Sequence, residues 1–560
     1  MPNVLIYIID ALRADHLSCY GYGRATSPAI DALAAEAGAV RFTRAYSPAT
    51  WTKPVAASIL SGCYPPAHGV RSRSDLFIRA VPRLAEILQG AGYRTAAVST
   101  IGNVSSVLGF GIGFDHFVDL YKDPALVKER EVSNTGAWKL YFEQDTTVVL
   151  PLAEDVNQRA MQWLAERARS EIGNHPCAAP RRGGGTGPSV GGHGGCAQTG
   201  PSAQDQSTNL PIHQSTNLPI ARPWFLFLWA LDPHDPYYPP PGFDRWRDPG
   251  YAGRIDGSAE SVRRVRTPAD VQRLLDLYDG EIAYVDQELG RLLDFLRASG
   301  QYDDTLVVVA GDHGEAFGEH GDFVHGHLAY EEVMHVPLLI KFPASMAVPG
   351  GAVDALAQLT DIAPTVLHAL GLGHLAGDMQ GVSLLPAVPS EGRSQTTDHR
   401  SPFTDHRSPP RSHAFSETQA SSANNRLLAV RSERWKYLRV DPPGDYAANG
   451  AAPRPASPQQ RLAGYWQQLA NPEMVKRLLR NPMFYLRRQM AQRQMLFDLE
   501  ADPQERHNVA GQHPAVVAAL DAALEAWLAE CRSYAELSDR QGVAGLDEAT
   551  LAQLHGLGYL

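Results

Sequence analysis

Cysteine is scarce in this chain, with five among 560 residues. The five are far apart and odd in number, and no C-x-x-C pair occurs among Cys19, Cys63, Cys177, Cys196 and Cys531. Zinc ribbons and disulfide frameworks need closely spaced or evenly paired cysteines. The sequence therefore excludes a fold built on either kind of cross-link.

Positive charge and long apolar runs are also lacking. The formal net charge is -11 and no basic stripe occurs, which argues against a nucleic-acid partner. The longest apolar run, W-F-L-F-L-W-A-L at 224–231, is far shorter than the roughly 20 residues of a membrane span. The start, M-P-N-V-L-I-Y-I-I-D, is typical of a strand and not of a signal peptide. We expect a cytoplasmic enzyme without a membrane span.

Apolar runs and helical stretches alternate along the chain. Continuous apolar runs at 4–9, 224–231 and 305–310 predict parallel strands buried on both faces. A helix is expected at about 28–37, with Ser27 as N-cap and a proline in its first turn. Another is expected at 268–298. This pattern predicts an α/β fold: a doubly wound, mostly parallel sheet flanked by helices.

Two segments carry short polar repeats that cannot form a packed core. Q-S-T-N-L-P-I occurs twice within 174–222, and T-D-H-R-S-P occurs twice within 390–413. We expect both segments to be disordered. From about residue 425 the sequence alternates like an exposed antiparallel strand, and 514–531 predicts an amphipathic helix. We therefore expect a catalytic domain at 1–389, a linker at 390–413 and a smaller C-terminal α+β domain at 414–560.

Three predicted strands end in an aspartate: Asp10, Asp232 and Asp312. Ligands of open α/β sheets bind at the carboxyl ends of the strands, where these carboxylates would converge and repel one another. A divalent cation would neutralise them. Histidines accompany these strand ends, at His234, His313, His325 and His327. Oxygen ligands favour calcium, magnesium or manganese, whereas added histidines favour zinc.

Thr52 stands at the start of a predicted helix, in T-W-T-K-P-V-A-A-S-I-L-S-G. A helix N-terminus favours a bound anion. A threonine hydroxyl bound to a metal could attack phosphorus or sulfur. The alternative is that Thr52 only caps the helix. Lys53 could help to hold the anion, or it could be an exposed lysine.

The order of several motifs resembles the sulfatase family, within the alkaline-phosphatase superfamily. They include P-N-V-L-I-Y-I-I-D-A-L-R-A-D-H-L, S-I-L-S-G-C-Y-P-P-A-H-G-V, L-D-P-H-D-P-Y, G-D-H-G-E-A-F-G-E-H-G and L-F-D-L-E-A-D-P-Q-E-R-H-N-V-A. The resemblance implies an α/β catalytic domain with a smaller C-terminal domain. It implies metal ligation by Asp10, Asp312 and His313. It places His234 near the leaving group or the anion, and His325 where many sulfatases have a lysine.

The chain departs from this family at the nucleophile. Sulfatases use a formylglycine made from Cys or Ser in C/S-x-P-x-R, but Thr52 stands at that position and Ala56 replaces the Arg. Threonine cannot yield the aldehyde, so no formylglycine is expected. Cys63 lies after the helix and is expected to be structural. Ala11 replaces a usual acidic residue, and Asn103 could donate to the anion, as in nucleotide pyrophosphatases of the superfamily.

These features predict a metal-dependent hydrolase of small phosphate or sulfate esters that forms a covalent Thr52 intermediate. Phosphate mono- or diesters are favoured over sulfate esters. A sulfuric ester hydrolase, a phospho-group transferase and a non-catalytic anion-binding protein remain as alternatives. The expected catalytic residues are Thr52, His234 and His325. The expected metal ligands are Asp10, Asp312, His313 and Thr52, with Asp232 as a further possibility. The expected substrate contacts are Lys53, Asn103 and His327.

Overall fold

The computed structural model describes most of the chain. The described residues are 1–123, 126, 151–173, 222–326, 328–385, 411–419, 426–441 and 494–541. His327 and nearly all of the two repeat-bearing segments therefore lie outside the described residues. None of the helices in the described part of the chain combines the length and apolar character that a membrane-spanning segment requires.

An eight-stranded sheet forms the centre of the molecule, in the order β10-β2-β9-β6-β1-β5-β3-β4. Its strands are β1 (Asn3–Ile9), β2 (Ala39–Tyr46), β3 (Arg94–Ser99), β4 (His116–Asp119), β5 (Trp224–Ala230), β6 (Thr305–Gly311), β9 (His335–Lys341) and β10 (Gly351–Gln358). All its neighbours pair parallel except β9, which is antiparallel to both β2 and β6. The prediction of a mostly parallel α/β sheet is confirmed.

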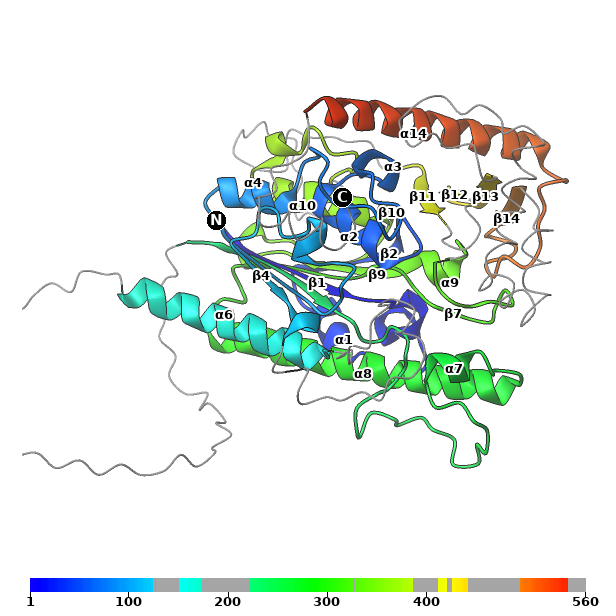
Figure 1. The fold of residues 1–560 in the computed structure, drawn as a ribbon, viewed down its shortest axis with the longest axis horizontal. Helices are drawn as coiled ribbons and strands as arrows, with labels where there is room; N and C mark the ends of the chain where they lie inside the picture. The colour runs from blue at the N-terminus through cyan, green and yellow to red at the C-terminus, as the bar shows by residue number, and fades with distance from the viewer. Residues whose placement is uncertain are drawn as a thin grey trace, which may run out of the picture.

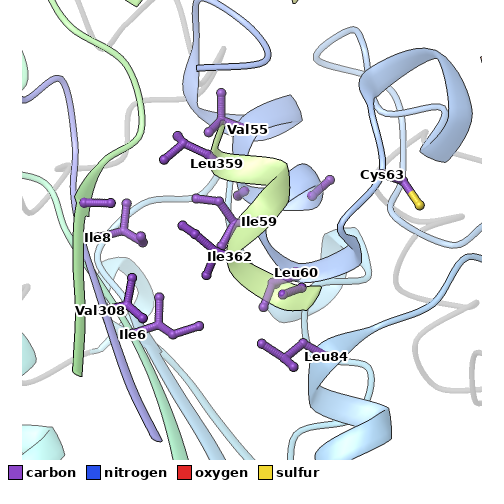
Figure 2. Packing of buried hydrophobic residues seen from close by; sticks show 14 of the residues in the cluster. Ile6, Ile8, Val55, Ile59, Leu60, Cys63, Leu84, Val308, Leu359 and Ile362 are labelled. Carbon is purple, nitrogen blue, oxygen red and sulfur yellow. The ribbon is translucent and has the colours of Figure 1, made fainter. Parts of the chain in front are cut away.

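The three strands predicted from apolar runs form the middle of this sheet. All residues of β1, β5 and β6 are buried, because helices cover both faces. Alternate residues of β1 point to opposite faces, so Ile6 and Ile8 join one core cluster and Tyr7 joins the other. Figure 2 shows Ile6 and Ile8 on the face that packs against Ile59.

Each face of the sheet has its own set of helices (Figure 1). One face carries α1 (Pro28–Ala34), α6 (Ala153–Gly173) and α8 (Pro268–Ala298), and the other carries α2 (Thr52–Ser61), α4 (Leu84–Gly90) and α10 (Ile362–Ala369). The shorter elements are α3 (Pro65–His68), α7 (Ala259–Val262), α9 (Glu331–Met334), β7 (Ala316–Phe317) and β8 (Phe323–Val324). The bounds of α8 match the predicted helix.

The first predicted helix is shorter than expected and is capped differently. It ends at Ala34 instead of about residue 37. Ser27 occupies the N-cap position, but its hydroxyl does not cap the helix and instead donates to Asp31. The carboxylate of Asp286 on α8 accepts the backbone N–H groups of Ala29 and Ile30. The free N–H groups of α1 are thus bound by another helix, which a local sequence pattern does not reveal.

A four-stranded antiparallel sheet, in the order β11-β12-β13-β14, forms the C-terminal unit together with α14. Its elements are β11 (Ala414–Gln419), β12 (Arg426–Arg431), β13 (Trp435–Asp441), β14 (Gln494–Asp498) and α14 (Pro514–Gln541). In Figure 1, α14 extends along this sheet and over α3. The smaller C-terminal domain is confirmed, and its helix continues beyond the predicted 514–531.

The expectation of an exposed strand after residue 425 is wrong. The segment forms two strands, and every residue of β12 is buried. Leu428 and Val430 share a core cluster with Leu524 of α14. Leu427, on the other face, packs in a cluster with Tyr46 of the central sheet. Because both faces of β12 are covered, the C-terminal unit and the catalytic sheet share buried surface.

Candidate active site

The carboxyl ends of β1 and β6 bring three predicted metal ligands together. These strands pair parallel, with Ile9 opposite Gly311, so the residues that follow them meet at one edge. Asp10, Asp312 and His313 are fully buried, and their ligand atoms all lie within 4.8 Å of one another. Nε2 of His313 lies 3.5 Å from Oδ1 of Asp10 and 3.2 Å from Oδ2 of Asp312.

The hydroxyl of Thr52 faces this cluster. Trp51 is the N-cap of α2 and Thr52 is the first residue of the helix, so Thr52 does not occupy the N-cap position. Its Oγ1 lies 3.5 and 3.4 Å from the two carboxylate oxygens of Asp10. It also lies 3.3 Å from Nε2 of His313. The helix start therefore presents a hydroxyl to the acidic cluster.

The polar atoms of this cluster fit a divalent cation. Oδ1 of Asp312 accepts the backbone N–H groups of Ala11 and His313, whereas its buried Oδ2 makes no hydrogen bond among the described residues. Nδ1 of His313 is 2.9 Å from the carbonyl of Gly314, to which it donates, so the lone pair of Nε2 faces the carboxylates. Three ligand atoms of mixed oxygen and nitrogen type thus converge in a buried place.

Burial makes it energetically unfavourable for Asp10 and Asp312 to be ionised side by side. Burial raises the pKa of Asp10 to about 6, although the positive charge of His234 opposes the shift. Burial and the neighbouring charge of Asp10 raise the pKa of Asp312 well above its ordinary value. Burial also lowers the pKa of the His313 imidazole, which therefore stays neutral and can ligate. A cation between the carboxylates would remove this cost.

A second group of ligand-type side chains adjoins the first. The ligand atoms of His234, Asp235 and His325 lie within 4.8 Å of one another. The ring of His325 is 4.7 Å from that of His234 and 4.2 Å from that of His313, measured between centroids. Burial lowers the pKa of His234, but nearby carboxylates, Asp235 and Asp10 foremost, outweigh it and raise the pKa to about 9. These carboxylates therefore favour the charged form of His234.

Two residues that the sequence did not single out support these groups. Oε1 of the buried Glu315 lies 3.0 Å from Nδ1 of His325, so it orients that ring. Burial raises the pKa of Glu315 to about 7, against the effect of charged His234. The indole N–H of Trp229 donates to Oδ2 of Asp10 over 3.0 Å. Glu315 is the last residue of the G-D-H-G-E motif, and its place in that motif is the sequence feature that could have indicated it.

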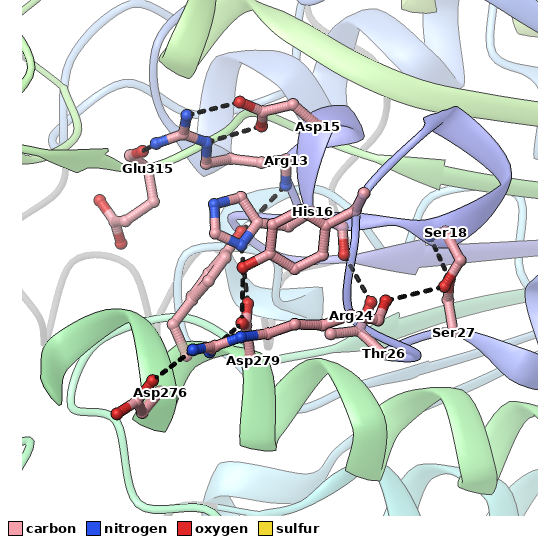
Figure 3. A network of polar contacts seen from close by, with 12 residues as sticks. Arg13, Asp15, His16, Ser18, Arg24, Thr26, Ser27, Asp276, Asp279 and Glu315 are labelled. Atoms are coloured by element: carbon pink, nitrogen blue, oxygen red, sulfur yellow. Dashed lines mark hydrogen bonds and ion pairs between the residues drawn. The ribbon is translucent and has the colours of Figure 1, made fainter. Parts of the chain in front are cut away.

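Arg13 joins the two loops that carry the predicted metal ligands. It lies three residues after Asp10, and its guanidinium donates to the backbone carbonyl of Glu315 over 2.9 Å. Figure 3 shows Arg13 between Asp15 and Glu315. The loop after β6 also approaches α9 closely at Gly314, where an added Cβ would lie 2.1 Å from the carbonyl oxygen of Glu332. Close packing therefore requires glycine at position 314, the second glycine of G-D-H-G.

The remaining predicted residues make other contacts or lie in a turn. Asp232 belongs to neither group, and its Oδ2 accepts the backbone N–H of Ala153 at the start of α6. Lys53 is buried and donates to the carbonyl of Arg73, and burial lowers its pKa to about 8. Asn103 lies in a turn after β3 and is partly exposed. Cys63 is buried beyond the C-terminus of α2, and burial raises its thiol pKa to about 12.

Comparisons with known proteins identify the family of the chain. A sulfatase family model matches residues 2–372, more than half of the 560-residue chain. A model of the C-terminal region of N-sulphoglucosamine sulphohydrolase matches residues 318–441. The N-acetylglucosamine-6-O-sulfatase of Bacteroides thetaiotaomicron is 25% identical over 430 residues, which cover 70% of this chain and 72% of that protein.

Solved structures share the fold over nearly the whole chain. A structure in complex with its substrate D-glucosamine-2-N,6-O-disulfate has a TM-score of 0.58 and 18% identity, and the match covers 96% of this chain and 98% of that one. The phosphonate monoester hydrolase of Agrobacterium radiobacter has a TM-score of 0.57 and 19% identity, with 95% and 96% covered. The chain therefore belongs to the sulfatase family, within the alkaline-phosphatase superfamily, and is an ester hydrolase.

Proposed function

We propose that this chain is a metal-dependent hydrolase of phosphate mono- or diesters that works through a covalent Thr52 intermediate. The observation that carries the proposal is the position of Oγ1 of Thr52, within 3.5 Å of both Asp10 and His313. A free threonine hydroxyl is a weak nucleophile and needs an activating neighbour. Asp10 and His313 supply that setting in a buried site.

Asp10, Asp312 and His313 would hold the metal, with the hydroxyl of Thr52 facing it. A bound divalent cation would lower the pKa of that hydroxyl and neutralise charge that develops on the substrate. The donor set of two carboxylates and one imidazole is compatible with calcium, magnesium, manganese or zinc.

The residues of the chain account for the remaining steps. The Thr52 hydroxyl gives its proton toward Oδ2 of Asp10, and Oγ1 forms a bond to phosphorus while the bond to the leaving oxygen breaks. The N-cap residue of α2 makes no side-chain hydrogen bond to the first turn, and the backbone N–H groups there would stabilise the anion. His234, held positive by its neighbouring carboxylates, protonates the leaving oxygen, and His325 beside it is the alternative donor. Water then attacks phosphorus and gives its proton to His234, while the bond from phosphorus to Oγ1 breaks and Asp10 returns its proton to Oγ1. A monoester substrate releases phosphate in this step, and a diester substrate releases a phosphate monoester.

Sulfate esters are the second candidate substrates. The match to N-acetylglucosamine-6-O-sulfatase over 70% of the chain favours them. In a sulfated formylglycine hydrate, the second hydroxyl can lose its proton and re-form the aldehyde, which expels sulfate from the other oxygen. A sulfate ester on Oγ1 of Thr52 has no second hydroxyl on the same carbon and would need attack by water. This difference favours phosphorus over sulfur at Thr52. Asn103 and His327 remain proposed substrate contacts. Lys53 could join them only if its ammonium left the carbonyl of Arg73, to which it donates over 2.8 Å.

The test compares wild type, Thr52→Ala and Thr52→Ser on p-nitrophenyl phosphate, bis-p-nitrophenyl phosphate and p-nitrophenyl sulfate. We expect Thr52→Ala to lower kcat by at least about 10³-fold, as for other removed nucleophiles. Metal content should persist, because Asp10, Asp312 and His313 remain. Acid-quenched wild type should carry one phosphoryl group on Thr52 by mass spectrometry. Full turnover by Thr52→Ala would exclude Thr52 as the nucleophile. Faster turnover of p-nitrophenyl sulfate than of the two phosphate esters would exclude the proposed preference for phosphate esters.

A further inference from the structure

Strand β11 of the C-terminal unit contacts the segment that leads into α2. The hydroxyl of Ser416 donates to the carbonyl of Ser47 over 2.7 Å, and the N–H of Glu417 donates to the carbonyl of Pro48 over 3.0 Å. These contacts run beside the chain just before Thr52. The C-terminal unit therefore reaches the nucleophile segment directly.

Thr418 continues this line of contacts with a buried hydroxyl pair. Oγ1 of Thr418 accepts the backbone N–H of Thr50 over 3.0 Å and lies 2.8 Å from Oγ1 of Thr50. Thr50 and Thr418 are 0% and 2% exposed, so water does not compete for these hydrogen bonds. Both the backbone and the side chain of Thr50 are thus held by one residue of β11.

Thr50 also contacts the loop of the second histidine. Its carbonyl accepts the backbone N–H of Gly326 over 2.9 Å, and Gly326 directly follows His325. Two residues after Thr50, α2 begins with Thr52. Thr50 therefore lies between the proposed nucleophile and the histidine beside the metal ligands, and Thr418 holds Thr50.

We propose that Thr418 is a positioning residue, through which the C-terminal unit fixes Thr52 and the His325 loop in one geometry. The inference rests on the proposed role of Thr52 as nucleophile. Because Trp51 alone separates Thr50 from Thr52, a shift at Thr50 moves the start of α2 and with it Oγ1 of Thr52. A misplacement of about 1 Å at a reacting atom can cost about 10²-fold in rate.

The experiment replaces Thr418 by valine, which keeps the shape and removes the hydroxyl, and by serine, which keeps the hydroxyl. Thr305→Val is the matched control, because Thr305 is a buried threonine whose hydroxyl bonds to the carbonyl of Gln301, away from the site. Steady-state kcat and KM are measured on whichever p-nitrophenyl ester wild type turns over fastest. We expect Thr418→Val to lower kcat by about tenfold or more, with KM within about twofold. Thr418→Ser and Thr305→Val should stay within about threefold of wild-type kcat.

The inference is overturned if Thr418→Val keeps wild-type kcat, if Thr305→Val loses as much, or if Thr418→Ser loses as much as Thr418→Val. Should Thr418→Val not fold, Thr50→Val decides: it removes the hydroxyl pair from the other side, and wild-type kcat in that variant overturns the inference. Full turnover by Thr52→Ala refutes the proposed nucleophile separately. An inactive Thr52→Ala together with a fully active Thr418→Val refutes only the positioning role.

Discussion

At the scale of single residues, the meeting of Asp10, Asp312 and His313 at one place could be predicted from the sequence because each follows a buried strand. Their partners could not. Trp229 is 219 positions from Asp10, and Thr418 is 368 positions from Thr50, so only the folded chain reveals these hydrogen bonds. Lys53 and Asp232 show the converse limit: residues next to a site in sequence can direct their polar atoms elsewhere.

Trp229→Phe should weaken metal binding, because it removes the N–H that donates to Oδ2 of Asp10. Loss of such an outer hydrogen bond typically costs 10–100-fold in metal affinity. The measurement is activity against free metal concentration after complete chelation. Trp224→Phe is the control, since Trp224 lies on the same strand and donates to Gln301 away from the site. Equal metal affinities for the two variants would contradict this prediction.

At the scale of elements, local sequence patterns predict the strands with apolar runs and the long helix α8. Tertiary contacts determine where α1 begins and ends and why β12 is buried, so local patterns do not predict these features. The antiparallel insertion of β9 between two strands is likewise a matter of pairing and leaves no local signal. Helix α8 also carries a feature that its amphipathic pattern does not predict: several acidic side chains on it are buried.

Glu281 on α8 makes the stability of the fold depend on pH. Its Oε1 accepts the N–H of Tyr238, its Oε2 has no hydrogen-bond partner among the described residues, and burial and the charge of Asp232 raise its pKa well above 4.5. Below about pH 4.5, Glu281 is protonated in both the folded and the unfolded protein, and its burial costs no charge. As the pH rises from there toward the pKa of Glu281 in the folded protein, the free energy of unfolding falls, because only the unfolded protein ionises this residue readily. Glu281→Gln should therefore gain stability relative to wild type from pH 5 to 9, by at most about 1.4 kcal/mol per pH unit.

Urea unfolding across this pH range measures the difference between Glu281→Gln and wild type. The control is Asp294→Asn on the same helix, because the side chain of Asp294 is 76% exposed. Its difference from wild type should not change with pH. A constant difference for Glu281→Gln would show that Glu281 ionises normally in the folded protein.

At the scale of the whole molecule, the sequence predicts two units but not how closely they join. A buried charge network crosses between them: the ammonium of Lys436 on β13 lies 3.1 Å from Glu331 of α9 and 2.9 Å from Glu505. Glu332, the next residue of α9, approaches Gly314 beside His313, a proposed metal ligand. The C-terminal unit therefore supports the catalytic loops from two directions, through β11 and through α9.

Lys436→Met should destabilise the protein strongly, because it leaves the buried carboxylate of Glu505 and the partly buried carboxylate of Glu331 without their shared cation. Removing one partner of a buried ion pair typically costs about 3–5 kcal/mol. Urea unfolding followed by fluorescence measures this loss. Arg434→Ala, which breaks an exposed pair with Asp498 in the same sheet, is the control and should leave the unfolding midpoint nearly unchanged. Similar midpoints for the two variants would contradict a supporting role for the network.

The contact between Thr50 and Thr418 also bears on how the protein is made. During synthesis, Thr52 and the first metal ligand emerge early, whereas β11 leaves the ribosome some 368 residues after Thr50. A nascent chain thus lacks the contact that holds the segment of the proposed nucleophile until β11 has been made. With the proposed positioning role of Thr418, hydrolytic competence should arise only after β11 has emerged.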